Sequence, residues 1–126
     1  MSHRVDMSLA LKDKGALRRA CKALGIDFKE GKHIVDLYSG QAEADASFQL
    51  PGWRYRVAVN LKTGTAAFDN YGGCWGKQEE LDRLVQEYTL QVAEHEAGVQ
   101  ELIMRGWIAS RVQQADGMVD LVVEEP

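Results

Sequence analysis

The sequence lacks the features that define several common protein classes. Its 126 residues include only two cysteines, Cys21 and Cys74, whereas a disulfide scaffold is dense in cysteine. No stretch approaches the roughly eighteen consecutive apolar residues of a membrane-spanning helix, and the first residues contain no apolar signal core. We therefore expect a soluble, cytoplasmic protein with no membrane partner, located in the host cytoplasm if a phage encodes it.

Metal-ligand spacing is also missing. The histidines His3, His33 and His95 are scattered, and neither cysteine has a ligand-like neighbour. Cys74 is the best nucleophile candidate because it precedes a predicted helix within a glycine-rich loop, but no base can be assigned to it. The sequence thus predicts no metal, no cofactor and no catalytic residue.

Positive charge is scarce over most of the chain. The net charge is −4, and because contacts with phosphate groups need clustered Lys and Arg, nucleic acid is not the expected partner. Residues 1–33 nevertheless hold eight Lys or Arg against four Asp or Glu, and the remainder holds seven against fifteen. This basic segment is interpreted as a solvated helix face, with a docking surface for an acidic partner as the alternative.

Apolar periodicity predicts the secondary structure. Alternation predicts strands at 4–11, 33–38, 46–50, 53–61, 65–71, 107–114 and 118–123, the last two joined by an Asp116-Gly117 turn. Helical spacing predicts one short helix at 14–24, between Asp13 and Gly25 as caps, and one long helix at 77–105, which ends at Gly106. The side of the long helix that faces the sheet is predicted from one stripe: Leu81, Val85, Tyr88, Val92, Val99 and Leu102. The near-heptad spacing of this stripe leaves open a helix–helix homodimer, and the oligomeric state stays unknown.

These elements predict an α+β fold. Connections between strands are too short for parallel crossovers, so we expect a mostly antiparallel sheet of about six strands with both helices on one face. A single domain is predicted for residues 1–126, with a short C-terminal tail at 124–126.

Aromatic residues mark the most promising binding region. The loop Tyr71–Gly76 combines three glycines, two large aromatics and a thiol, and loops on a rigid scaffold often carry binding. Trp75 has two interpretations, as a plug of the core or as a recognition residue. The predicted binding residues are Tyr38, Trp53, Tyr71, Cys74 and Trp75.

The order of several short motifs resembles the domain-of-unknown-function family 1257, which includes the hypothetical chloroplast open reading frame 35 proteins. The motifs are Met1-Ser2-His3, Ala23-Leu24-Gly25, Tyr38-Ser39-Gly40, Cys74-Trp75-Gly76, Leu84 to Tyr88, Gly106-Trp107 and the final 116–123 segment. Arg4, Cys74, Glu87 and the acidic tail depart from the family pattern, so the resemblance implies a divergent member, from a phage or a bacterium. Family members resemble accessory proteins encoded near AAA-type ATPases, which implies such an ATPase as a partner.

The leading hypothesis is therefore a non-enzymatic accessory protein that binds a protein partner. The alternative is a binder of a small molecule or nucleotide derivative, or a small hydrolase, with its pocket between the sheet and the long helix.

Overall fold

The computed structural model describes residues 5–38, 40–115 and 119–126. The elements run in the order β1 (Val5–Ser8), α1 (Lys14–Leu24), β2 (Asp27–Leu37), β3 (Gly40–Gln49), β4 (Val57–Asn60), β5 (Thr65–Phe68), the 3-10 helix η1 (Tyr71–Gly73), α2 (Gln78–Glu94), α3 (Ala97–Met104), β6 (Ile108–Gln113) and β7 (Val119–Glu124). This composition confirms the α+β class. The predicted Asp116-Gly117 turn and the Met1-Ser2-His3 motif lie outside the described residues.

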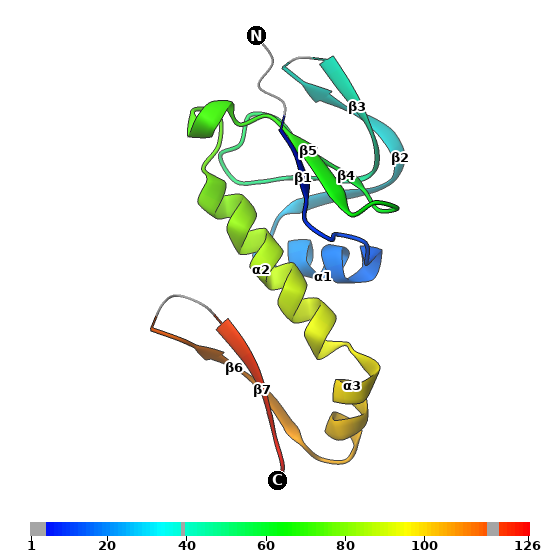
Figure 1. The fold of residues 1–126 in the computed structure, drawn as a ribbon, viewed down its shortest axis with the longest axis vertical. Coiled ribbons are helices and arrows are strands. Elements are labelled where there is room, and N and C mark those ends of the chain that lie inside the picture. The colour runs from blue at the N-terminus through cyan, green and yellow to red at the C-terminus, as the bar shows by residue number, and fades with distance from the viewer. Residues whose placement is uncertain (1–4, 39, 116–118) are drawn as a thin grey trace.

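The main sheet has five antiparallel strands in the order β1-β5-β4-β3-β2. Helices α1 and α2 pack together on one of its faces (Figure 1). The helix residues Leu17, Leu81 and Leu84 meet Phe48, Val57 and Phe68 of the strands in one buried cluster. Burial of these apolar side chains is the main source of stability for the fold.

Local signals in the sequence account for the ends of α1. The Asp13 carboxylate accepts a hydrogen bond from the Ala16 backbone N–H at 3.0 Å, and Gly25 closes the helix with φ of 68°. The predictions of Asp13 as the N-terminal cap and Gly25 as the C-terminal cap are thus confirmed. Tyr88 of α2 reaches the same junction, where its hydroxyl accepts from the Asp13 N–H at 3.0 Å and donates to the Ala10 carbonyl at 3.2 Å.

The hairpin formed by β2 and β3 extends beyond the rest of the sheet and curls over it. The pairing register shifts between Glu30 and His33, around Gly31 with φ of 94°, and such a bulge bends a strand. A second, smaller buried cluster results on the face opposite the helices: Val35, Leu37, Ala42, Ala44, Ala58 and Ala67, with Tyr55 packed against it. The hairpin tip is thereby carried toward the segment that precedes β4.

Several predicted element boundaries were wrong. Strand β2 begins at Asp27 rather than at 33 and includes a charged stretch, because an edge strand tolerates exposed charges. Strand β3 begins at Gly40 rather than at 46. The segment 53–56 is not a strand, since the Pro51-Gly52 turn directs Trp53 into the helix-side core and Tyr55 to the opposite face.

The predicted long helix is in fact two helices. His95 and Glu96 leave the helical conformation, with ψ angles of 9° and 141°, and α3 then starts at Ala97. Past Gln91 neither helix buries a residue, so tertiary packing no longer holds one continuous axis. His95 itself is exposed.

The predicted stripe of the long helix was only partly correct. Leu81 and Tyr88 are buried, whereas Val92 is 39% exposed, and Val99 and Leu102 belong to α3, away from the sheet. The buried face of α2 instead comprises Leu81, Leu84, Glu87, Tyr88, Leu90 and Gln91.

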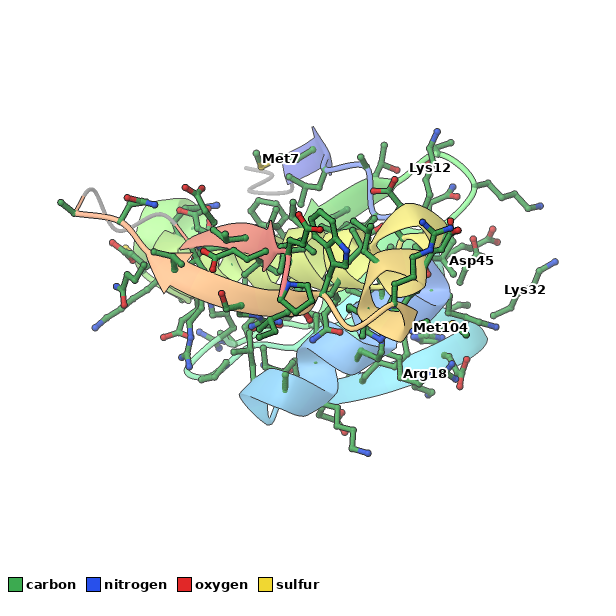
Figure 2. The ribbon with its side chains drawn as sticks, turned by 90° about the horizontal axis from the view of Figure 1, so that it is seen from below. Met7, Lys12, Arg18, Lys32, Asp45 and Met104 are labelled. Carbon is green, nitrogen blue, oxygen red and sulfur yellow. The ribbon has the colours of Figure 1, made fainter. Side chains whose placement is uncertain are left out.

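The last two strands do not join the main sheet, contrary to the prediction of one sheet of about six strands. They form a separate two-stranded sheet, β6-β7, beside the lower part of α2 (Figure 1). Met104, at the end of α3, is 87% exposed and is labelled with Met7 in Figure 2. Both strands of this small sheet consist of exposed or half-buried residues.

Candidate functional site

Four aromatic rings converge at the tip of the β2–β3 hairpin. Trp75 is central: its ring centroid lies 4.8 Å from Tyr71 in a stacked arrangement, 5.1 Å from Tyr38 and 5.6 Å from Tyr55. These separations fall within the range of favourable aromatic pairs. We call the four residues Tyr38, Tyr55, Tyr71 and Trp75 the aromatic cluster. Tyr38 is 56% exposed and Tyr71 is 44% exposed, so the cluster forms part of the protein surface.

Backbone hydrogen bonds hold the segments that carry the cluster. The Trp75 N–H donates to the Asn70 carbonyl at 2.9 Å, and the Trp75 carbonyl accepts from the Arg54 N–H at 2.8 Å. The second bond joins the loop after η1 to the segment between β3 and β4. Tyr71 adopts φ of 47°, a left-handed conformation that is uncommon for a residue other than glycine. Hydrogen bonds therefore hold the backbone of the Trp75 loop against the segment that contains Arg54 and Tyr55.

A cation already lies on these rings. The Arg54 guanidinium carbon is 5.2 Å from the centroid of Trp75 and 5.9 Å from that of Tyr55. Both distances lie within the reach of a cation–π interaction. Arg54 is exposed, so the contact forms at the protein surface.

A buried carboxylate lies next to the cluster in the chain. Asp69 follows the last residue of β5 and is fully buried, with 0% exposure. Neither of its carboxylate oxygens has a hydrogen-bond partner among the described residues. Because an unpaired buried carboxylate is costly, Asp69 is the least satisfied polar side chain of the described structure.

The structure divides the five predicted binding residues into one group of three and two separate residues. It brings Tyr38, Tyr71 and Trp75 together. Trp53 lies elsewhere: it is 5% exposed, its ring meets Phe68 edge-on at 5.6 Å, and its indole N–H donates to the Lys77 carbonyl at 3.0 Å. Trp53 is thus a core residue.

Cys74 also lies apart from the aromatic cluster. Its side chain is exposed, and the residue lines a depression together with Pro51 and Lys77 that includes none of the four rings. The other thiol, Cys21, is buried in α1, and burial raises its pKa to about 12 despite the nearby charge of Arg56. Cys21 therefore remains a neutral thiol at physiological pH.

Sequence reasoning missed Arg54 and Tyr55. Strict alternation placed Tyr55 on the same face as Trp53, which suggested that both rings fill one core. The Pro51-Gly52 dipeptide was the available signal, because a turn there resets the alternation. No local pattern, however, indicates that Tyr38, 17 residues earlier in the chain, contacts the same Trp75 ring as Tyr55.

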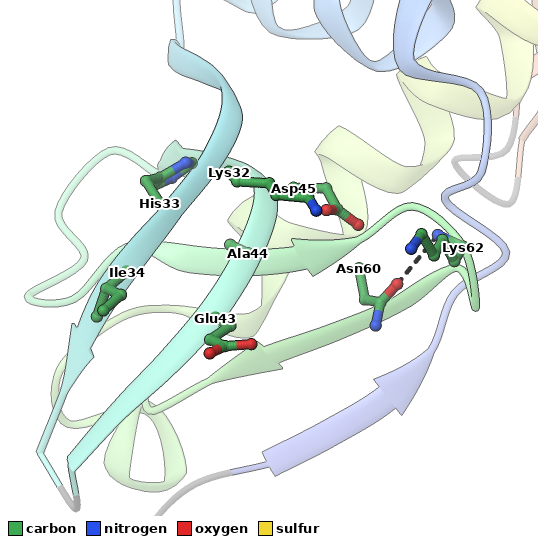
Figure 3. Close-up of a pocket in the computed structure, with 8 residues that line it drawn as sticks. All are labelled: Lys32, His33, Ile34, Glu43, Ala44, Asp45, Asn60 and Lys62. Atoms are coloured by element: carbon green, nitrogen blue, oxygen red, sulfur yellow. Dashed lines mark hydrogen bonds between the residues drawn. The ribbon is translucent and has the colours of Figure 1, made fainter.

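A polar pocket lies under the bent hairpin (Figure 3). It has a volume of about 560 Å³ and is lined by Lys32, His33, Ile34, Glu43, Ala44, Asp45, Asn60 and Lys62. His33 Nδ1 lies 2.6 Å from the Gly31 carbonyl, which can only accept, so Nδ1 carries the proton. His33 Nε2 lies 2.7 Å from the Ser47 hydroxyl, and this hydroxyl accepts a hydrogen bond from Arg56 Nε at 3.0 Å.

The Ser47–His33 pair has the geometry of a nucleophile and its base. Ser47 is nevertheless 0% exposed, so a substrate has no access to its hydroxyl. The pair instead belongs to a chain of hydrogen bonds that continues from Arg56 to Asp27 at 2.6 Å. This chain supports the bend of the hairpin.

A second hollow of about 570 Å³ lies between β1, α2 and the start of β7. Its lining is mainly apolar, from Met7, Leu9, Leu81, Val85 and Val119, and includes no aromatic ring. Within the described ranges, no group of three or more His, Cys, Asp and Glu side chains could hold a metal ion. None of the described helices is long and apolar enough to cross a membrane.

Comparison with protein-family models, with curated proteins and with solved structures found no match to this chain. The site is therefore interpreted from its own geometry.

Proposed function

We propose that this protein is a non-enzymatic binding module that captures a protein partner through the aromatic cluster. One observation supports this most strongly: four rings from three separate segments meet at the surface, where Tyr38 and Tyr71 keep about half of their area exposed. Tyr, Trp and Arg are the residues most enriched at the energetic centres of protein interfaces. Rings on a fixed backbone also lose little conformational entropy when a partner binds.

The identity of the partner belongs to the same proposal. The resemblance to the domain-of-unknown-function family 1257 suggests an accessory role beside an AAA-type ATPase, in the cytoplasm of a bacterium or of a phage host. The chemistry of the cluster supports a protein partner independently of that resemblance, because exposed tyrosines bind protein surfaces well.

Affinity capture from the native host, followed by mass spectrometry, tests the proposal when it compares variants. Tyr38→Ala should reduce recovery of the partner at least about tenfold, since the loss of a central interface aromatic costs about 2 kcal/mol or more. Ile34→Ala is the matched control, because Ile34 lies on the same hairpin, is 59% exposed and is outside the cluster. Equal recovery by Tyr38→Ala and the unmodified protein would contradict the proposal.

The alternative, a binder of a small apolar molecule, is favoured by the hollow beside α2. Its apolar lining and volume suit such a ligand. Val85→Trp would fill this hollow without touching the cluster. A small apolar molecule that stays bound to Tyr38→Ala but is lost from Val85→Trp would favour the hollow over the aromatic cluster.

A further inference from the structure

The position of Arg54 indicates what the aromatic cluster recognises. In the free protein this side chain places a guanidinium group over Trp75 and Tyr55. The contact is at the surface, where a group from a partner can replace it. We propose that the cluster binds an arginine side chain of the protein partner, whose guanidinium replaces that of Arg54, with Asp69 as the counter-charge. This inference rests on the proposed function, because it names the chemistry of the partner at the same surface.

The buried carboxylate of Asp69 is the second, independent observation. Asp69 directly precedes Asn70, whose carbonyl accepts the Trp75 backbone N–H at 2.9 Å. By strand alternation Asp69 shares the sheet face of Ala67, which belongs to the small cluster against which Tyr55 packs. Both oxygens of this carboxylate are unpaired among the described residues, and a negative charge is weakly screened in a buried environment. That charge favours a cation on the rings.

Guanidinium suits the cluster better than an ammonium ion. It is planar, stacks on aromatic faces and is more weakly hydrated than the lysine ammonium group, so it loses less on leaving water. The structure already contains this geometry in Arg54 itself. The opposite interpretation is that Arg54 binds an anionic ligand, and the two interpretations predict opposite effects of removing it.

The test uses methylguanidinium, methylammonium and inorganic phosphate as probes. The readout is the indole N–H resonance of Trp75 in a two-dimensional NMR spectrum, identified by its absence in Trp75→Phe. Methylguanidinium should shift this resonance at lower concentration than methylammonium does, and phosphate should leave it unchanged. In Arg54→Gln, half-saturation by methylguanidinium should occur at about two- to fivefold lower concentration, because a competing cation–π contact at an exposed site has been removed.

Asp69→Asn in the Arg54→Gln background tests the counter-charge. The substitution keeps the shape of the side chain and removes its charge, so methylguanidinium should bind more weakly. Unchanged affinity would overturn the role of Asp69. A phosphate-induced shift that disappears in Arg54→Gln would overturn the whole inference, as would the absence of any shift with methylguanidinium.

These outcomes are separable from a failure of the proposed function. If the cluster captures a partner but does not bind methylguanidinium, only the chemistry inferred here is wrong. If Tyr38→Ala leaves partner capture intact, the proposed function fails whatever the probes show.

Discussion

The buried position of Asp69 is energetically unfavourable for a carboxylate side chain. Both carboxylate oxygens are buried and neither has a partner among the described residues. Unsatisfied groups of this kind concentrate at functional sites, where stability is sacrificed for binding. The proximity of Asp69 in the chain to Tyr71 and Trp75 fits that pattern.

Asp69→Asn should therefore increase the stability of the protein. A neutral amide of the same shape removes a buried charge, and the free energy of unfolding should rise by about 1 kcal/mol or more. Urea unfolding at neutral pH measures the change. Asp36→Asn is the control, since Asp36 is exposed and a surface substitution should alter stability by no more than about 0.5 kcal/mol. A destabilised Asp69→Asn would show that the carboxylate has a partner in solution.

Gly76 is a second residue whose identity is set by its surroundings. A Cβ atom at this position would lie 2.5 Å from two ring atoms of Trp53, which is itself 5% exposed and held by the Lys77 carbonyl. Because the buried ring cannot move aside freely, Gly76→Ala should destabilise the protein by about 1–3 kcal/mol, the usual cost of overpacking.

The matched control for Gly76→Ala is Gly98→Ala in α3. There the nearest atom to an added Cβ is a Glu96 carboxylate oxygen at 3.8 Å. Alanine also favours helices over glycine, so Gly98→Ala should be neutral or stabilising by up to about 1 kcal/mol. Thermal melts of the two variants compare them directly. Equal stability of Gly76→Ala and the unmodified protein would mean that the loop carrying Trp75 shifts readily.

At the scale of the elements, α2 shows why periodicity misleads at the end of a helix. The apolar spacing of the sequence continues from Val85 through Val92 to Val99, so it predicts one helix with one buried stripe. Periodicity reports which residues are apolar but not where the neighbouring sheet ends. The buried face of α2 ends at Gln91, and the helical conformation is interrupted at His95 and Glu96.

Substitutions on α2 distinguish the predicted stripe from the observed face. Leu84 is 0% exposed, so Leu84→Ala should cost about 2–5 kcal/mol of stability. Val92→Ala should cost less than about 1 kcal/mol, because Val92 is 39% exposed. Val92→Asp should also be tolerated. If Val92 were buried, as the predicted stripe implies, this substitution would instead unfold the protein. Denaturant unfolding of both alanine variants checks the order, and a larger loss for Val92→Ala would reverse it.

At the scale of the whole molecule, features that depend on neighbouring residues could be predicted, whereas contacts between residues far apart in the chain could not. The caps Asp13 and Gly25, the alternation of β4 and β5 and the aromatic loop could all be predicted from neighbouring residues. The bend of β2–β3 over the sheet could not, because it depends on one bulge near Gly31 and on contacts with residues far along the chain. Three of the five predicted binding residues lie together in the structure, and the prediction did not include Arg54 and Tyr55, which contact the same Trp75 ring.

The β6–β7 sheet is weakly packed against the rest of the described structure. A two-stranded sheet is marginal by itself in water, and none of its described residues is fully buried. Its attachment to α2 includes Arg111, which donates to both oxygens of Glu87 at 2.9 and 2.8 Å and also pairs with Glu94 at 2.5 Å. These hydrogen bonds raise the pKa of Arg111, so its guanidinium group stays charged at both acidic and neutral pH.

Glu87 makes this attachment sensitive to pH. Burial alone would raise the pKa of the Glu87 carboxyl, but hydrogen bonds from Arg111 and Gln91 and the charges of Arg111 and Arg83 outweigh burial and lower it. A carboxyl whose pKa is lower in the folded state contributes stability above its unfolded pKa of about 4.3. That contribution is lost as the pH falls through the folded value. The β6–β7 sheet should therefore loosen below about pH 4 before the main sheet does.

Amide hydrogen exchange, expressed as protection factors, tests this order. At neutral pH, Glu87→Gln should reduce protection in β6 and β7 while leaving β3 and β4 unchanged, and acidification should then add less loss than in the unmodified protein. Glu101→Gln is the control, because Glu101 pairs with Arg105 where both side chains are more than half exposed, and such pairs contribute little. Simultaneous loss of protection in both sheets of the Glu87→Gln protein would instead mean that α2 transmits the disturbance and that the two sheets unfold as one cooperative unit.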